Sequence, residues 1–180
     1  MTMPRIVAIC GLKRSGKDVL ANYISKTYGY SHCKIAHPLK KLISDTFDIS
    51  EDVLETSKKD EVHQDLNIKP RQLMDFIGTH VFQHEIQKLL PHIGRSFWIN
   101  KIVRDIKPDD YVVISDLRFV HEWETLKSFD TLTIKIVRPF TSSDGLESEK
   151  EIDHIKEDIL LVNDGTIEDM CRKVSKHIVL

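Results

Sequence analysis

Residues 5–18 read RIVAICGLKRSGKD, and the order of residue types in this segment indicates the kind of fold. Residues 5–10 form a nearly continuous apolar run rich in β-branched side chains, which is typical of a strand buried on both faces. Residues 11–18 carry the G-x-x-x-x-G-K spacing of a loop that binds phosphate. Over residues 19–28 the apolar positions change to helical spacing. A strand, a glycine loop and a helix in this order predict an α/β fold with an anion site at the loop.

Strand-like and helix-like segments alternate along the rest of the chain. Short apolar runs predict further strands at residues 30–36, 111–115, 131–137 and 159–162. Apolar residues at helical spacing predict helices from Pro38, from Pro70, over 98–106, over 119–129 and after Thr166, which can cap the last helix. Such alternation predicts a parallel sheet covered on both faces, with ligands at the carboxyl ends of its strands.

Three local expectations follow from the same pattern. Residues 49–69 are polar and charged, which predicts a helical or looped excursion. Gly78 is expected to interrupt the helix that begins at Pro70. The final helix is expected to bury one face, which consists of Ile167, Met170, Cys171, Val174 and Ile178.

Composition bounds the class of protein. The 180 residues, 41% of them hydrophobic, predict one ordinary globular domain with room for a small inserted part. Lys and Arg number 26 and Asp and Glu 28, and this balance is unlike that of a general nucleic-acid binder. No apolar run reaches the roughly 20 residues of a membrane span, and the first residues do not resemble a signal peptide. Three scattered cysteines (Cys10, Cys33, Cys171) predict a reduced, cytoplasmic protein.

The residue types of the glycine loop suit the binding of a phosphate group. Gly11 and Gly16 allow the backbone to turn tightly, so that its N–H groups face an anion. The helix that begins near Lys17 adds the positive end of its dipole. Lys17 can bridge the β- and γ-phosphates of a nucleotide as a point charge.

Asp18 departs from the usual loop pattern. Ser or Thr normally stands at this position and holds magnesium. A carboxylate beside a triphosphate would repel it unless Mg²⁺ lay between them, directly or through water. The sequence therefore predicts a Mg²⁺ role for Asp18. The alternative is that Asp18 only caps the helix.

Asp116 and Arg118 form a second feature at the end of the strand predicted at 111–115. A carboxylate at that edge can orient magnesium, accept a proton or fix a hydroxyl. Arg118 can hold a phosphate with two parallel hydrogen bonds. The alternative is an ordinary surface turn.

Other patterns predict no chemistry. His80 and His84 have the spacing of a zinc pair on a helix, but no third ligand is evident, so a solvated helix face is expected. The acidic residues Asp144, Glu147, Glu149, Glu151 and Asp153 lack the spacing of a calcium loop and are interpreted as a flexible lid. Ser115 lacks the G-x-S-x-G context of a hydrolase nucleophile, and no G-x-G-x-x-G dinucleotide motif is present.

Six motifs occur in a fixed order: GLKRSGKD, RQLMDFIGTH, FWINKI, YVVISDLRFVHEWE, IVRP and VNDGTIEDM. Over about residues 5–174 the chain resembles the deoxynucleoside monophosphate kinases of T-even bacteriophages and large DNA viruses. The resemblance implies a three-layer P-loop nucleoside monophosphate kinase fold in a single domain over residues 1–180. It also implies a helical substrate-binding insertion at about 48–107 and a lid at about 139–157. The implied reaction moves the γ-phosphoryl group of ATP, with Mg²⁺, to a deoxynucleoside 5′-monophosphate, and the implied assembly is a homodimer.

The resemblance also assigns roles to residues. Lys17, Arg14, Asp116 and Arg118 would be catalytic, and Arg14 would face the phosphates of both substrates. The ATP site would comprise Gly11, Lys13, Arg14, Ser15, Gly16, Lys17, Asp18, Val19, Arg138, Asn163 and Asp164, the last two near the adenine. The acceptor site would comprise Arg14, Arg71, Gly78, Thr79, Trp98, Asp116, Leu117, Arg118 and Glu122. Trp98 and Phe76 would offer stacking surface, with core packing as the alternative.

Two departures and two rival functions stay open. His80 stands where the phage enzyme has Asp, and Leu146 stands where the family often has His, so base preference is open. A phosphomevalonate kinase of the animal type has a similar loop, and a non-catalytic P-loop module would bind ATP without an acceptor. Trp98 with Gly78 and Thr79 favours a nucleotide acceptor. The cations Lys13, Arg14, Arg71 and Arg118 exceed what one nucleotide needs, which favours two anionic substrates.

Overall fold

The computed structural model describes residues 3–139, 141 and 150–178, and the chain divides into two compact units. The sheet unit comprises Met1–Lys34 and Val103–Leu180, and the helical unit comprises Ile35–Ile102. Among the residues described, no helix combines the length and the apolar character that crossing a bilayer requires.

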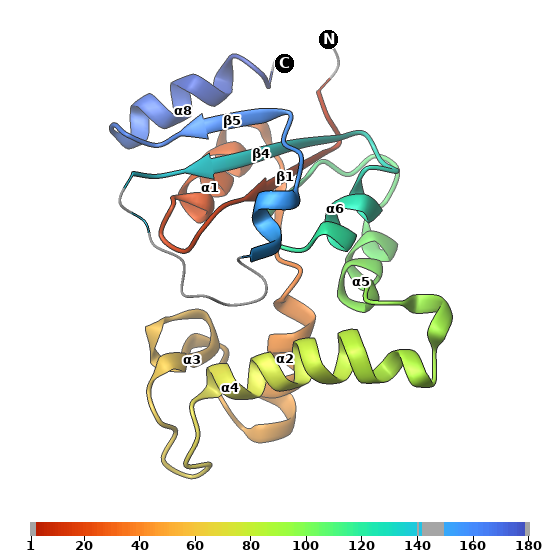
Figure 1. The fold of residues 1–180 in the computed structure, drawn as a ribbon. Helices are drawn as coiled ribbons and strands as arrows, with labels where there is room; N and C mark the ends of the chain where they lie inside the picture. Colours follow the sequence, from red (N-terminus) through yellow and green to blue (C-terminus); the bar gives the residue numbers. More distant parts are fainter. Residues whose placement is uncertain (1–2, 140, 142–149, 179–180) are drawn as a thin grey trace. The chain divides into compact units, whose positions relative to one another are not determined.

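The sheet unit is built on five strands: β1 (Ile6–Cys10), β2 (Ser31–Cys33), β3 (Val112–Leu117), β4 (Thr131–Val137) and β5 (Ile159–Val162). All neighbours are parallel, in the order β2-β3-β1-β4-β5. Figure 1 shows β1, β4 and β5 side by side. The predicted parallel sheet is therefore confirmed. β3 is longer than predicted, so Asp116 lies within the strand rather than after it.

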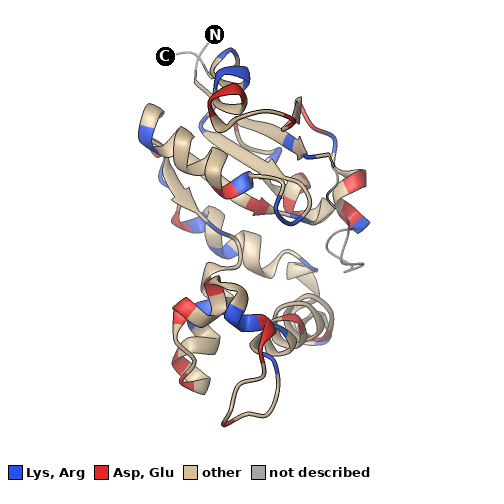
Figure 2. Ribbon diagram, turned by 90° about the vertical axis from the view of Figure 1, so that its left-hand side faces the viewer, with Lys and Arg blue, Asp and Glu red and all other residues tan. Residues whose placement is uncertain are grey.

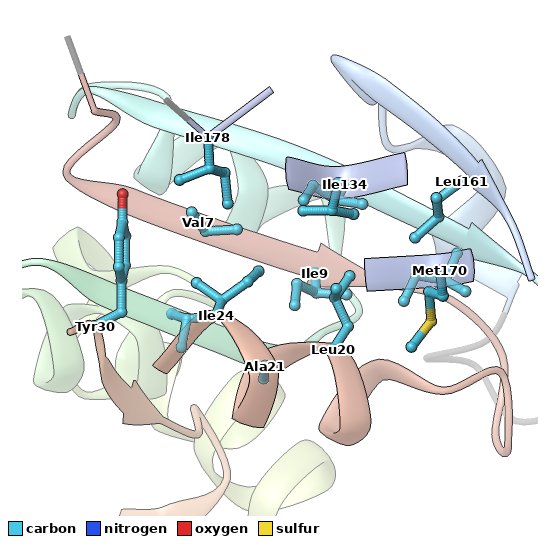
Figure 3. Packing of buried hydrophobic residues seen from close by; sticks show 13 residues of the cluster. Val7, Ile9, Leu20, Ala21, Ile24, Tyr30, Ile134, Leu161, Met170 and Ile178 are labelled. Carbon is cyan, nitrogen blue, oxygen red and sulfur yellow. The ribbon is translucent and has the colours of Figure 1, made fainter. Parts of the chain in front are cut away.

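Helices cover both faces of this sheet. On one face, α1 (Lys17–Tyr28) and α8 (Ile167–Ser175) bury a continuous apolar cluster against the strands (Figure 3). On the other face lie α6 (Val120–Leu126) and the short η5 (Glu151–His154), where Lys135 of β4 donates a hydrogen bond to the carbonyl of Ile152. Because the strands are covered on both sides, β1 is fully buried along its length.

The last helix begins as predicted, but one of the five residues expected on its buried face is exposed. The hydroxyl of Thr166 accepts a hydrogen bond from the amide of Asp169, which confirms the predicted cap. Met170, Cys171 and Val174 are buried as predicted, and so is Ile178, which follows the end of α8. Ile167 is 56% exposed, contrary to expectation. It shares the face by spacing but stands at the first position of the helix, a turn before the buried part.

The helical unit contains α2 (His37–Phe47), α3 (Glu51–Glu55), η1 (Ser57–Asp60), α4 (Pro70–Asp75), η2 (Phe76–His84), η3 (Glu85–Lys88) and η4 (Pro91–Ile93). The first part of α5 (Phe97–Asp105) also belongs to it. The predicted polar excursion at 49–69 is confirmed as two short helical pieces followed by irregular chain.

Gly78 does not interrupt the helix as predicted. It lies inside η2, which continues α4 without a break. A Cβ atom at this position would lie 2.5 Å from Cδ2 of Leu39 on α2. The glycine is therefore explained by the close packing of this helix on α2, which local propensity cannot reveal.

Candidate active site

The glycine loop forms a cradle between β1 and α1. Gly11 has a φ of +147°, and a Cβ there would lie 2.4 Å from the main-chain oxygen of Ile136. Gly16, directly before α1, has a φ of +109°. The ammonium group of Lys17 donates hydrogen bonds to the carbonyl oxygens of Gly11 (2.8 Å) and Leu12 (2.7 Å). Because these carbonyls are held by Lys17, the loop is fixed in its curved shape without a ligand.

Ser15 is a buried residue of this loop. Its side chain is fully buried, and its hydroxyl has no hydrogen-bond partner among the residues that the structure describes. Its carbonyl accepts a 2.8 Å hydrogen bond from the side-chain Nδ2 of Asn163, directly after β5. A buried hydroxyl without a partner is costly unless a ligand completes it. The cradle therefore fits a bound phosphate group.

Positive charge gathers around the loop. Burial, reinforced by the charge of Arg118, lowers the pKa of Lys17 to about 8. Arg138 donates a long 3.5 Å hydrogen bond to the carbonyl of Arg14, whose own φ is +64°. The side chains of Lys13 and Arg14 are exposed. The sheet unit thus brings the predicted cations of the ATP site to one end of β1.

Asp18 lies in the first turn of α1 and not at its N-cap. The helix is capped by Gly16, with no side-chain hydrogen bond. The Asp18 carboxylate instead accepts a 2.9 Å hydrogen bond from Ser115 and pairs with Lys34 at 3.5 Å. Burial opposes its charge, but Lys34, Ser115 and the nearby His32 outweigh burial and lower the pKa of Asp18. Asp18 is therefore an ionised, oriented carboxylate at the start of the helix.

A bulge in β3 accounts for the position of Asp116. Ala8 of β1 pairs with Ile114, but Cys10 pairs with Leu117. Ser115 and Asp116 therefore face the single residue between Ala8 and Cys10, and such a bulge re-aims side chains.

Asp116 and Asp18 both act on the charge of Lys17, raising its pKa against the larger effect of burial. Carboxylate oxygens are the protein ligands that Mg²⁺ prefers, so the donor set fits this ion. Among the described residues, no three His, Cys, Asp or Glu side chains come together as a metal cluster. Water and phosphate oxygens would have to supply the other ligands.

Glu122 holds the main chain that follows β3. It is 4% exposed, and its carboxylate accepts hydrogen bonds of 3.0 Å from the amides of both Arg118 and Phe119. Burial raises the pKa of Glu122 to about 8, although the two amides oppose this. Leu117 is fully buried, so only its main chain can face a ligand. Glu122 therefore orients the turn that carries Arg118.

Asp164 and Val19 show no comparable link to the loop. Asp164 pairs with Lys173 at 2.8 Å, and Val19 is 41% exposed on α1.

The helical unit holds four of the predicted acceptor residues, Arg71, Gly78, Thr79 and Trp98. Arg71 forms a forked ion pair with Asp60. The indole N–H of Trp98 donates a 2.9 Å hydrogen bond to the carbonyl of Gly78, and Trp98 is 6% exposed. Thr79, next to Gly78, is partly buried. Trp98 is therefore packed inside the helical unit, as the core-packing alternative has it, and it does not offer the predicted stacking surface, whereas Phe76 is 57% exposed and offers open aromatic surface.

The histidine pair and the predicted lid contribute little to the description of the site. His80 packs against Phe76, with ring centroids 5.3 Å apart, and the described residues show no metal cluster around it or His84. Residues 140 and 142–149 of the predicted lid, among them Asp144 and Leu146, lie outside the described residues. The described Glu151 accepts a 3.0 Å hydrogen bond from the amide of Val120 at the start of α6.

Sequence reasoning missed the residues that support the site. It considered Ser115 only as a nucleophile, whereas Ser115 joins Asp18 to His32 on β2 by hydrogen bonds of 2.9 and 2.8 Å. It gave Lys34, Lys40 and Lys59 no role. The adjacency of Ser115 to Asp116 was the one available signal. The partners come from separate strands and helices, so spacing along the chain could not reveal them.

Comparisons with known proteins agree with this geometry. The family model described as deoxynucleotide monophosphate kinase matches residues 5–67 and 55–174. A putative deoxynucleotide monophosphate kinase of Acanthamoeba polyphaga mimivirus is 31% identical over 94% of this chain and 93% of its own length. The deoxynucleotide monophosphate kinase of Escherichia phage RB69 is 24% identical over 95% of this chain and 98% of its own.

A solved structure supports the fold independently. The dephospho-CoA kinase of Campylobacter jejuni superposes with a TM-score of 0.52 at 17% identity, covering 96% of this chain and 94% of that one. At this identity the likeness concerns the fold alone, and it agrees with a parallel sheet flanked by helices. The family model and the mimivirus relative each span most of the sequence. The chain therefore belongs to the deoxynucleotide monophosphate kinase family.

Proposed function

We propose that this chain transfers the γ-phosphoryl group of ATP to a deoxynucleoside 5′-monophosphate, giving the diphosphate and ADP. An oxygen of the acceptor's phosphate forms a new bond to the γ-phosphorus, and the bond from that phosphorus to the β,γ-bridging oxygen breaks. Such transfer needs positioning and charge neutralisation rather than a covalent enzyme intermediate. Membership of the family and the shape of the loop both support this reaction.

The observation that carries the proposal is the cradle around Ser15. A buried hydroxyl without a partner, glycines with no room for a Cβ and a lysine held over the loop form a site suited to nucleotide phosphates. Lys17 would neutralise the β- and γ-phosphates, and Arg118 would stabilise charge on the group in transfer. Lys13, Arg14 and Arg138 would hold the outer phosphate oxygens.

Magnesium would be held on the Asp18 side of the loop, with Asp116 as a further carboxylate. When bound, it would neutralise the triphosphate and draw charge from the leaving oxygen. In its absence the Asp18 carboxylate would repel ATP, so we expect activity to require a divalent cation.

The acceptor would be held by Arg71, with Thr79 and Phe76 lining the base and sugar. Replacement of Arg71 by Ala is expected to weaken monophosphate binding far more than ATP binding. An equal loss for both substrates would contradict this assignment. We further expect the protein to act in the cytoplasm on small molecules, without nucleic acid, and as a homodimer.

A substrate panel tests the function. The purified protein is mixed with Mg-ATP and each deoxy- and ribonucleoside monophosphate, and ADP release is measured. At least one deoxynucleoside monophosphate should give ADP far above the background of ATP hydrolysis. ADP release with phosphomevalonate alone would favour the rival kinase. ATP binding without ADP release from any acceptor would indicate a non-catalytic module.

A further inference from the structure

Five charged side chains converge in the helical unit, away from the glycine loop in sequence. Lys40 of α2 pairs with Glu55 of α3 at 2.6 Å. Arg71 of α4 pairs with Asp60 of η1 through a fork in which Nη2 lies 3.1 Å from Oδ2. Lys59 of η1 donates 3.4 Å hydrogen bonds to the carbonyls of Leu54 and Glu55. We call these five charged residues the α2–α4 charge cluster, and Figure 2 shows both signs of charge next to one another in these helices.

Lys40 is the least expected member of this cluster. It is 6% exposed, and among the described residues it is the one lysine or arginine that is buried. Taking an ammonium group out of water costs several kcal/mol, which one ion pair with Glu55 offsets only in part. Glu55 itself remains about one-third exposed. A buried lysine at this cost points to a function for its charge.

The three cations crowd one another. Burial, together with the charges of Lys40 and Arg71, lowers the pKa of Lys59 to about 8. The cluster holds three positive and two negative side chains, so its formal charge is 3 − 2 = +1. Each further anion that entered it would relieve repulsion among the cations. The cluster is therefore built to accept negative charge.

Asp60 shows where that negative charge would sit. The side-on fork it forms with Arg71 uses the same pair of N–H groups that arginine presents to a phosphate. Asp60 is the last residue of η1, and its side chain is 37% exposed. Its carboxylate therefore already meets water on one side.

We infer that Lys40, Lys59 and Arg71 together form the binding site for the acceptor's 5′-phosphate, and that Asp60 occupies this site until the substrate displaces it. The inference rests on the proposed function and adds Lys40, Lys59 and the competing Asp60 to it. With a phosphate dianion in place of Asp60, the charges of the three cations, Glu55 and the phosphate sum to 3 − 1 − 2 = 0. The same exchange explains how the cluster stays folded without substrate.

Binding measurements on two variants and one control test this site. Lys59→Met removes a cation of the cluster, and Lys58→Met removes the adjacent, exposed lysine, which pairs with Asp52 instead. Calorimetry then gives the affinity for the deoxynucleoside monophosphates, for the matching deoxynucleosides and for ATP. Lys59→Met should weaken monophosphate binding by about 10-fold, the effect of one charge-assisted contact, and leave deoxynucleoside and ATP binding unchanged. Lys58→Met should change none of the three.

Asp60→Asn separates displacement from a merely structural ion pair. If Asp60 competes with the phosphate, its loss should tighten monophosphate binding by about 3- to 10-fold. If the pair with Arg71 only supports the fold, Asp60→Asn should weaken binding or lower the melting temperature with no gain in affinity. That result would overturn the inference.

The outcomes distinguish this inference from the proposed function. If deoxynucleoside monophosphates are phosphorylated but Lys59→Met behaves like Lys58→Met, the phosphate site is wrong and the function stands. If no monophosphate is phosphorylated, inorganic phosphate serves as the probe. Weaker binding of phosphate by Lys59→Met and tighter binding by Asp60→Asn would then support the site, although the function has failed.

Discussion

The hydroxyl of Ser115 donates a 2.9 Å hydrogen bond to the carboxylate of Asp18, and this bond joins the bulge of β3 to the first turn of α1. The same hydroxyl lies 2.8 Å from Nε2 of His32 on β2. Three neighbouring elements of the sheet unit thus fix one carboxylate beside the glycine loop. A hydroxyl ordinarily occupies the Asp18 position, so the extra charge needs support that a hydroxyl does not.

Replacement of Ser115 by Ala should loosen this carboxylate. Groups that orient a metal ligand typically affect metal affinity by about 10-fold or more. We therefore expect the Mg²⁺ concentration for half-maximal activity to rise about 10-fold, while the melting temperature changes little. Ser128→Ala, which removes an exposed hydroxyl bonded to the carbonyl of Thr125, is the control. An unchanged Mg²⁺ requirement in Ser115→Ala would separate this bond from metal binding.

Asn163 and Asp164 are expected to differ, although both were assigned to the ATP site. Asn163→Ala removes the 2.8 Å hydrogen bond to the carbonyl of Ser15 and so frees the glycine loop. Loss of one such bond should weaken ATP binding by about 3- to 10-fold. Asp164→Asn affects only an exposed ion pair with Lys173, so ATP affinity should stay the same. Calorimetric titration with ATP compares the two variants, and equal losses would contradict this distinction.

Lys17→Met should abolish phosphoryl transfer with the fold intact. The methionine keeps the length of the side chain but loses the charge on the phosphates, and we expect turnover to fall by at least about 100-fold. The wild-type pKa of about 8 adds a pH effect, because Lys17 loses its proton above that value. ATP affinity of the wild type should therefore weaken as pH rises through 8, and this weakening should disappear in Lys17→Met. Unchanged turnover would remove the loop from the mechanism.

The sequence predicted the sheet and the glycine loop because both depend on local signals. A buried β-branched run followed by two glycines and a helix is compatible with few local structures. The cap of the last helix is equally local, because Thr166 accepts its hydrogen bond from Asp169, three residues later. Gly78 shows the limit of this reasoning. Gly78 lacks a side chain because Leu39, 39 positions earlier in the chain, packs against it. Helix propensity alone predicted that the helix would be interrupted there.

The contacts that orient the site residues could not be predicted from the sequence for a similar reason. Ser115 meets Asp18 because β3 contains a bulge, and a bulge of one residue leaves no mark in the apolar pattern. Lys40 lies on α2 between the buried residues Leu39 and Ile43. A lysine is nevertheless predicted to be exposed, because lysines are rarely buried in proteins. Only the packing of α2 against α3 and α4 shows that its charge is enclosed.

Glu122→Gln should change how stability depends on pH. Burial raises the pKa of Glu122 from the ordinary 4.5 to about 8, so between these values the folded protein holds a proton that the unfolded chain releases. Stability contributed by this group is therefore present below pH 4.5 and is lost as pH rises through 8. Glutamine still accepts hydrogen bonds from the amides of Arg118 and Phe119 but does not ionise. The melting temperature of Glu122→Gln should exceed that of the wild type increasingly from pH 5 to pH 8, and a constant difference would contradict the shift.

A double-mutant cycle tests the packing of Gly78 on Leu39. In Gly78→Ala the new Cβ would lie 2.5 Å from Cδ2 of Leu39, and such overpacking costs about 1–3 kcal/mol, partly offset by the better helix propensity of alanine. Leu39→Ala alone leaves a cavity that costs about 2–5 kcal/mol. In the double variant the added methyl group enters the space that the leucine vacates. Because the propensity gain is the same in both backgrounds, it cancels, and urea unfolding should show a double variant more stable than the sum of the single effects by at least about 1 kcal/mol. Additive losses would mean that the two residues do not meet, and the absence of a side chain at Gly78 would then need another cause.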